Sequence, residues 1–173
     1  MAQSFLVATI KDKMNHPIVF LDIDGVCNYE DFLEANRHKR CYPDFDDDDW
    51  LDPERVCLLN RIVEETGAKF VLSSSWRIVT GVTKTFAALK QCGFTGDLID
   101  ETPSMSHEKF EERRAAEIHD WLYRHSMVDR WVVLDDNKVL VEPSWRFVQT
   151  HFSVGLTEAL IDRAIEVLRR TDQ

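Results

Sequence analysis

The chain has 173 residues and a formal net charge of −10, with 44% hydrophobic and 30% charged residues. This length favours a single domain, residues 1–173, with a hydrophobic core of its own, and is too short for two comfortable domains. The acidic balance disfavours broad electrostatic binding to nucleic acid or to an anionic membrane, and no stretch approaches the about 20 apolar residues of a membrane span.

The first predicted strand covers residues 17–21 and runs directly into two acids. Asp22, Ile23, Asp24 and Gly25 follow its last apolar residue. A short apolar run bounded by turn residues indicates a buried strand, and open α/β sheets bind ligands beyond the carboxyl ends of their strands. A divalent metal and a phosphate ester would use both acids, one as nucleophile and one as proton carrier. The residues alone do not decide which acid attacks, and an acidic turn is the alternative.

A highly charged stretch, residues 28–52, follows this strand. It contains a basic run, Arg37 to Arg40, and an acidic run, Asp46 to Asp49. The basic run could contact a substrate phosphate, but pairing with nearby aspartates and solvent is the simpler interpretation. We expect the acidic run to be a solvated loop, because it lacks the alternating acids and central glycine of an EF-hand.

The remaining elements follow from apolar periodicity and helix-start patterns. Asp52, Pro53 and Glu54 form a helix start, and Gly67 ends that helix. The later elements are a strand over 69–73, a helix over 82–92, a short strand over 97–100, a helix over 108–125, a strand over 131–134, a last strand over 146–150 and a helix from Thr157. Strands that alternate with helices of this length predict an α/β fold, with a mostly parallel sheet flanked by helices.

Three of the predicted strands end in polar residues of complementary kinds. Because a parallel sheet brings the carboxyl ends of its strands to one edge, we expect these residues to meet. The carboxylates would hold Mg²⁺ and supply a nucleophile, while a serine hydroxyl and backbone N–H groups would hold phosphate oxygens. The residues are, in chain order, Asp22 and Asp24, Ser73 and Ser74, and Asp135 and Asp136.

A cation is still needed to offset charge on the phosphoryl oxygens, and two neighbouring arginines are candidates. On the helix over 108–125, Arg114 shares the apolar stripe with Ile118. Arg113 shares a face with Glu117, which we expect to be solvated. A charged residue on the inward stripe needs a partner, so Arg114 is expected to reach the carboxylates. The alternative is an arginine that extends over the apolar face to solvent.

The order of these motifs resembles the haloacid dehalogenase (HAD) superfamily of phosphohydrolases. Asp22-Ile23-Asp24-Gly25-Val26 is similar to its first motif, Ser73 to the second, Arg114 to the third and Asp135-Asp136 to the fourth. The resemblance covers Ile18 to about Asn137 and implies a Rossmann-like fold. One departure is the arginine at the third motif, where lysine is commoner; it keeps the charge but changes the hydrogen-bond geometry.

The resemblance implies a role for each of these residues. Asp22 would be the nucleophile that forms an aspartyl-phosphate. Asp24 would protonate the leaving oxygen, then activate water, and its backbone carbonyl would bind Mg²⁺. Asp136 would be a metal ligand or an acid just behind the ligands. The implied Mg²⁺ ligands are Asp22, Asp24, Asp135 and Asp136, and the implied phosphoryl-binding residues are Ser73 and Arg114.

Two further runs resemble a subgroup of small HAD proteins described as RNA-repair-like, or "Swiss Army Knife". They are Ser73 to Arg77 and Arg114 to Leu122. We expect Ser74 and Arg77 to bind substrate, with a structural pairing of Arg77 as an equal alternative. The stretch 28–52 is too short for a full cap domain, which predicts a small flap, a minimal cap and an open site.

Together these features predict a cytoplasmic, Mg²⁺-dependent phosphomonoesterase that acts through an aspartyl-phosphate. Four cysteines without a Cys-x-x-Cys pair favour reduced thiols and hence the cytoplasm. The expected substrate is a phosphorylated small molecule, and no membrane partner is expected. The alternatives are a nucleic-acid 3′-end phosphatase in RNA or DNA repair, and a HAD-like binding module without turnover. The sequence does not fix the oligomeric state.

Overall fold

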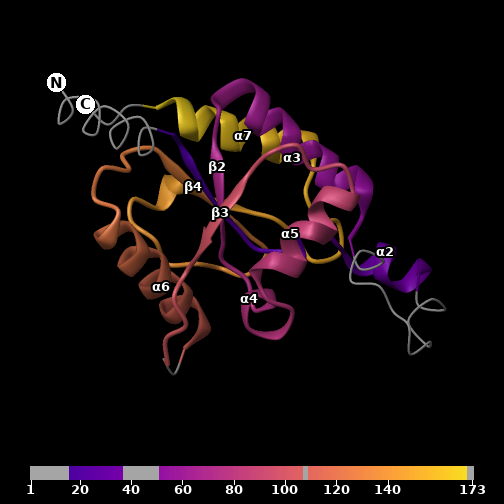
Figure 1. Ribbon diagram of the computed structural model, residues 1–173, viewed down its shortest axis with the longest axis horizontal. Coiled ribbons are helices and arrows are strands. Elements are labelled where there is room, and N and C mark those ends of the chain that lie inside the picture. Colours follow the sequence, from indigo (N-terminus) through magenta and orange to yellow (C-terminus); the bar gives the residue numbers. More distant parts are fainter. Residues whose placement is uncertain (1–15, 37–50, 107–108, 171–173) are drawn as a thin grey trace, which may run out of the picture.

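The apolar runs predicted as strands join one five-stranded parallel sheet. The computed structural model describes residues 16–36, 51–106 and 109–170. The strand order is β3-β2-β1-β4-β5, and each neighbouring pair is parallel (Figure 1). The predicted α/β fold class is therefore confirmed. The strands are β1 (Ile18–Leu21), β2 (Lys69–Leu72), β3 (Leu98–Glu101), β4 (Trp131–Asp135) and β5 (Phe147–Gln149).

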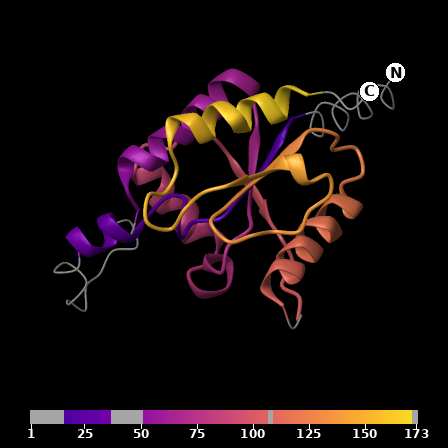
Figure 2. The same ribbon diagram turned by 180° about the vertical axis from the view of Figure 1, so that it is seen from behind.

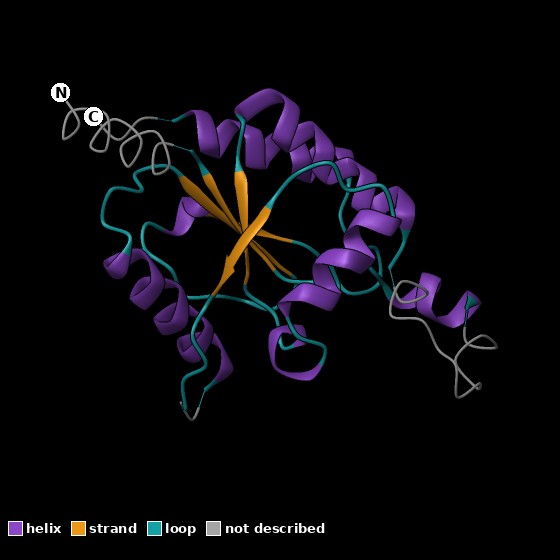
Figure 3. Cartoon of the chain, viewed as in Figure 1, coloured by secondary structure: helices purple, strands orange, loops and turns teal. Residues whose placement is uncertain are grey.

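Helices cover both faces of this sheet, as Figures 1 and 2 show from opposite sides. One face packs against α3 (Pro53–Thr66), α5 (Val82–Gln91) and α7 (Glu158–Arg169), and the other packs against α6 (Phe110–Arg124). Short elements complete the described chain (Figure 3): α2 (Glu30–Ala35), α4 (Trp76–Val79) and the 3₁₀ turn η3 (Ser144–Arg146). Within the described ranges, every helix is too short or too polar to cross a membrane.

The alternating side chains of β1 divide the core between the two faces. Val19 and Leu21 join the core beneath α3, α5 and α7, whereas Ile18 and Phe20 join the core beneath α6. All four are buried, as expected for a parallel strand that is covered on both faces. Trp121 of α6 packs edge-on against Phe20, with 5.4 Å between ring centroids. β1 is the central strand of the sheet, and packing on both of its faces holds its carboxyl end in place.

The ends of α3 and α7 follow the predicted capping residues. The Asp52 side chain accepts a hydrogen bond from the Glu54 N–H at 2.9 Å, and Gly67, at φ +67°, ends α3. The Thr157 hydroxyl accepts one from the Leu160 N–H at 3.4 Å at the start of α7. A side chain that caps a helix in this way stabilises it by about 1 kcal/mol.

Several segments differ from the sequence-based expectation. α2 lies in the charged stretch 28–52 and α4 follows Ser73, where no helix is predicted, and β3 begins one residue later than predicted. Helices of six and four residues are too short to show the repeated apolar pattern that reveals longer ones. Arg37–Arg40 and Asp46–Asp49 lie outside the described residues, so the contacts expected of them stay predictions.

Candidate active site

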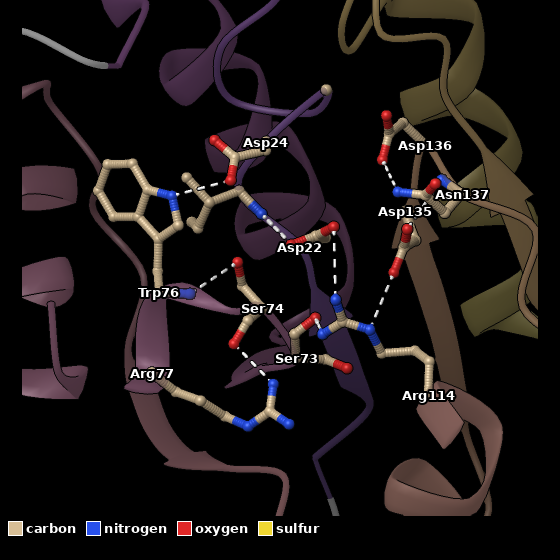
Figure 4. Close-up of polar contacts among 12 residues, drawn as sticks. Asp22, Asp24, Ser73, Ser74, Trp76, Arg77, Arg114, Asp135, Asp136 and Asn137 are labelled. Carbon is tan, nitrogen blue, oxygen red and sulfur yellow. Dashed lines mark hydrogen bonds and ion pairs between the residues drawn. The ribbon is translucent and has the colours of Figure 1, made fainter. Parts of the chain in front are cut away.

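The carboxyl ends of β1, β2 and β4 bring the predicted polar residues together (Figure 4). The Asp22 N–H donates to the Leu134 carbonyl at 2.9 Å, and the Ser73 N–H donates to the Leu21 carbonyl at 2.8 Å. These two bonds continue the sheet's ladder past the last residues of β1 and β2. Asp22 therefore lies between Ser73 and Asp135, at the sheet edge where parallel pairing predicts them.

Three carboxylates at this edge fit a divalent metal. Ligand atoms of Asp22, Asp135 and Asp136 lie within 4.8 Å of one another. Asp135 Oδ2 is buried without a hydrogen bond, while Oδ1 accepts one from the Asn137 N–H at 2.9 Å. Hard divalent cations such as Mg²⁺ prefer carboxylate oxygens of this kind. The side chain of Asp24 lies outside the cluster, so only its backbone carbonyl could serve as the ligand that the motif implies.

Arg114 brings a positive charge to these carboxylates. Its Nη2 lies 3.8 Å from Asp22 Oδ2, its Nε lies 3.4 Å from Asp135 Oδ2, and its side chain is 4% exposed. Another guanidinium N–H donates to the Ser73 carbonyl, and the buried Ser73 hydroxyl has no hydrogen-bond partner. The helical phase predicts this inward position of Arg114 correctly. A buried hydroxyl without a partner, next to a guanidinium, suits a phosphoryl oxygen.

Asp24 has different surroundings from Asp22. Its Oδ1 accepts a hydrogen bond from Asn28 Nδ2 at 2.9 Å. Its Oδ2 accepts one from the Trp76 indole Nε1 at 3.1 Å, which Figure 4 shows. Sequence reasoning missed both donors. The spacing of four residues between Asp24 and Asn28, within a tight turn, could have identified Asn28. Trp76 is 52 residues away from Asp24 and has no local pattern that points to it.

Comparison with known families accounts for this arrangement. The family model of the HAD domain in Swiss Army Knife RNA repair proteins matches residues 18–161. The chain belongs to this family. No curated protein and no solved structure matches the chain significantly. Membership indicates a hydrolase of the phosphatase type; HAD domains generally use a divalent metal, for which this HAD domain has a cluster of three aspartates.

Ser74 and Arg77, expected at the substrate, take part in internal contacts of the HAD domain. Arg77 Nη2 lies 2.8 Å from Glu117 Oε2, and Nη1 donates to the Ser74 carbonyl at 2.6 Å. The Ser74 hydroxyl accepts a hydrogen bond from the Trp76 N–H at 3.3 Å. The structural pairing of Arg77 is therefore present, and contact of Ser74 or Arg77 with substrate stays a prediction.

The expected solvated position of Glu117 is wrong. Glu117 is 2% exposed and accepts a hydrogen bond from the Met105 N–H at 3.1 Å, in addition to its ion pair with Arg77. The charge pattern of α6 gives no indication that a cation from α4 lies against this face. The ion pair joins α4 to α6, and the Met105 hydrogen bond joins α6 to the segment after β3. Glu117 thus connects the helix that carries Arg114 to the segment that follows Ser73.

Burial changes the acidity of the metal-binding candidates. It raises the pKa of Asp22 from 3.8 to about 6, although the Arg114 guanidinium opposes the shift. Burial, with repulsion from the Asp22 carboxylate, raises the pKa of Asp135 to about 8, and burial also raises the pKa of Asp136. Arg114 alone thus does not offset the cost of burying these charges, and a divalent cation would supply the missing positive charge.

We expect Mg²⁺ to stabilise the HAD domain more at pH 8 than at pH 5. The folded-state pKa values of Asp22 and Asp135 lie above 3.8, so metal-free stability is lost as pH rises from about 4 through 6 and 8. Mg²⁺ binds the deprotonated carboxylates, and at a hundred times its Kd it would add about 2.7 kcal/mol. Thermal unfolding in Mg²⁺ and in EDTA at both pH values measures this difference. The Asp135→Asn variant should lose this pH-dependent difference in stabilisation by Mg²⁺. Equal Mg²⁺ effects on the parent at both pH values would contradict the expectation.

Gly25→Ala is expected to displace the Asp136 carboxylate and to weaken Mg²⁺ binding by about 10- to 100-fold. Gly25 has φ +71°, and an added Cβ would collide with the side chain of Asp136. Mg²⁺ titrations followed by thermal shift measure the affinity.

Gly67→Ala is the matched control for this substitution. Gly67 has φ +67° and open space around an added Cβ, so the variant carries similar backbone strain, about 1 kcal/mol, away from the site. Its Mg²⁺ affinity should equal that of the parent. The same loss of affinity in both variants would mean that strain, and not contact with Asp136, causes it.

Proposed function

We propose that this HAD protein is a Mg²⁺-dependent phosphomonoester hydrolase that forms an aspartyl-phosphate on Asp22. The observation that carries the proposal is the contrast between the two acids after β1. Asp22 shares the metal-binding cluster and lies beside Arg114, whereas Asp24 is held apart by two neutral donors. This contrast supports Asp22 as the nucleophile and Asp24 as the proton carrier, an assignment that the residues alone do not decide.

The first step forms one bond and breaks one bond. Asp22 Oδ1 accepts a hydrogen bond from the Ile23 N–H at 2.8 Å, so Oδ2, on the side of Arg114, is the better placed oxygen to attack phosphorus. As the new bond forms, the bond from phosphorus to the leaving oxygen breaks. Arg114 and the Ser73 hydroxyl would hold the non-bridging oxygens. Bound Mg²⁺ would reduce the negative charge shared by the carboxylates and the phosphoryl group.

Asp24 would carry the proton in both steps. Its carboxyl group gives a proton to the leaving oxygen as the ester bond breaks, and its carboxylate then takes a proton from the attacking water. The water oxygen bonds to phosphorus as the bond from phosphorus to the Asp22 oxygen breaks, which releases inorganic phosphate and restores the Asp22 carboxylate. The nucleophile and the proton carrier are thus different acids, and only the proton carrier acts on the water in the second step.

The test is a turnover screen of the purified full chain in Mg²⁺ and in EDTA. Substrates should include 4-nitrophenyl phosphate, nucleotides, sugar phosphates and phosphorylated oligonucleotides. We expect Mg²⁺-dependent release of phosphate from the aryl ester, with modest selectivity among small phosphates because the stretch 28–52 is too short for a full cap domain. Absence of turnover on every substrate would contradict the proposal and favour a binding module. A cytoplasmic location belongs to the same proposal, on the basis of the cysteine pattern.

A nucleic-acid 3′-end phosphatase is the second candidate, favoured by the description of the family as RNA repair proteins. The net charge of −10 opposes it. Comparing kcat/KM for a 3′-phosphorylated oligonucleotide with that for a matched mononucleotide, at two salt concentrations, separates the candidates. A preference for the oligonucleotide that falls with salt would support end repair. Equal, salt-insensitive values would leave the small-molecule phosphatase.

A further inference from the structure

Both oxygens of the Asp24 carboxylate are hydrogen-bonded to side chains that carry no charge. Asn28 holds Oδ1 at 2.9 Å, and the Trp76 indole holds Oδ2 at 3.1 Å. The donors approach from different parts of the chain, Asn28 from the turn after β1 and Trp76 from the start of α4 (Figure 4 shows the Trp76 side). Two bonds to the two oxygens fix the plane of the carboxylate, which a single bond would leave able to rotate.

The two donors are themselves held in place. Asn28 is fully buried, and its Oδ1 accepts a hydrogen bond from the Gly25 N–H at 3.0 Å, which fixes the amide with its N–H₂ group toward Asp24. The Trp76 ring packs against the larger core, and its backbone N–H donates to the Ser74 hydroxyl. The next residue, Arg77, anchors the same turn through its buried pair with Glu117.

The kind of donor matters as well as its position. An indole N–H can donate a hydrogen bond but cannot accept one, and it carries no positive charge. Each carboxylate oxygen has a second lone pair, so these bonds leave room for the proton that Asp24 must carry. Asp22, which must attack as a carboxylate, instead faces the charged Arg114.

We propose that Trp76, together with Asn28, is a positioning residue that orients the Asp24 carboxyl group toward the leaving oxygen. This inference rests on the proposed function. The role concerns one step: the bond from Asp22 to phosphorus forms, the bond from phosphorus to the leaving oxygen breaks, and a proton moves from Asp24 to that oxygen. Trp76 gains or loses no atom in this step.

The test uses Trp76→Phe and two substrates that differ in their need for a proton. A nitrophenolate leaves readily without protonation, whereas an alkoxide does not. The value of kcat/KM covers only the steps up to departure of the leaving group, so hydrolysis of the phospho-enzyme does not enter it. We expect kcat/KM to fall at least about tenfold more for an alkyl phosphate than for 4-nitrophenyl phosphate, since general acid catalysis contributes about 10²–10⁴-fold. A structural role alone would lower both values equally.

Trp145→Phe is the matched control, because the Trp145 ring is also partly buried against the larger core. It should leave the ratio of the two kcat/KM values unchanged. Asn28→Ala removes the hydrogen bond to Oδ1 of Asp24 and should change the ratio in the same direction as Trp76→Phe. It is the alternative test if the Trp76→Phe variant does not fold. An unchanged ratio in a folded variant would overturn the positioning role while the phosphatase stands. Absence of turnover by the parent would overturn the proposed function and this role with it.

Discussion

Asp22→Asn is expected to abolish phosphatase turnover, with a loss on the order of 10⁴-fold or more, as for other covalent nucleophiles. An amide cannot form the aspartyl-phosphate, and Asp24 is held by Asn28 and Trp76 outside the cluster with Arg114. Single-turnover and steady-state release of phosphate by the purified variant measure the effect. Turnover within tenfold of the parent would overturn the assignment of Asp22.

The same variant should remain folded. Burial raises the pKa of Asp22, so replacing the carboxyl group by a neutral amide should not lower the stability of the metal-free protein at neutral pH. The amide oxygen can still accept the hydrogen bond from the Ile23 N–H. Asp24→Asn is the informative comparison, because it should also be slow but should allow a phospho-enzyme to accumulate. Intact-protein mass spectrometry after mixing with substrate distinguishes the two variants.

Arg114→Ala is expected to lower kcat/KM by roughly 10²–10³-fold, as for loss of a preorganised charge at the phosphoryl group. The substitution also leaves Asp22 and Asp135 buried without the guanidinium that lies between them. We therefore expect the metal-free protein to lose about 3 kcal/mol of stability, and Mg²⁺ to restore part of it. Kinetics in saturating Mg²⁺ and chemical unfolding with and without Mg²⁺ measure the two effects separately.

Arg113→Ala is the control for this prediction. Arg113 is next to Arg114 in the sequence and is half-buried, with its guanidinium carbon 5.2 Å from the Phe110 ring centroid. The substitution should change stability by no more than about 0.5 kcal/mol and leave kcat/KM close to that of the parent. Equal kinetic losses in the two variants would contradict the assignment of Arg114 to the phosphoryl group.

The parts of the site that could be predicted are those fixed by local periodicity. Asp22, Ser73 and Asp135 follow apolar runs, and parallel strands must bring such positions to one edge. Arg114 could be placed because helical phase relates it to Ile118, which is fully buried. These inferences need only the geometry of one element and the rule that parallel strands align.

The parts that could not be predicted depend on contacts between distant segments. Glu117 looks solvated when only α6 is considered, and its burial follows from Arg77, which belongs to α4. The contact between Trp76 and Asp24 joins the segments after β2 and β1. No periodic pattern within either segment carries this information, because the position of each side chain depends on how the two segments pack together.

The two backbone hydrogen bonds that continue the ladder beyond β1 and β2 place the backbone amide of Asp22, the proposed nucleophile, within the cooperatively unfolding centre of the sheet. The amide hydrogens of Asp22 and Ser73 should exchange with solvent as slowly as those of the core strands, only when the whole sheet opens. If so, the arrangement of Asp22 and Ser73 should not change gradually before the whole domain unfolds. Destabilising substitutions in the distant core should lower the fraction of active molecules, and so Vmax, while the molecules that remain folded keep their KM.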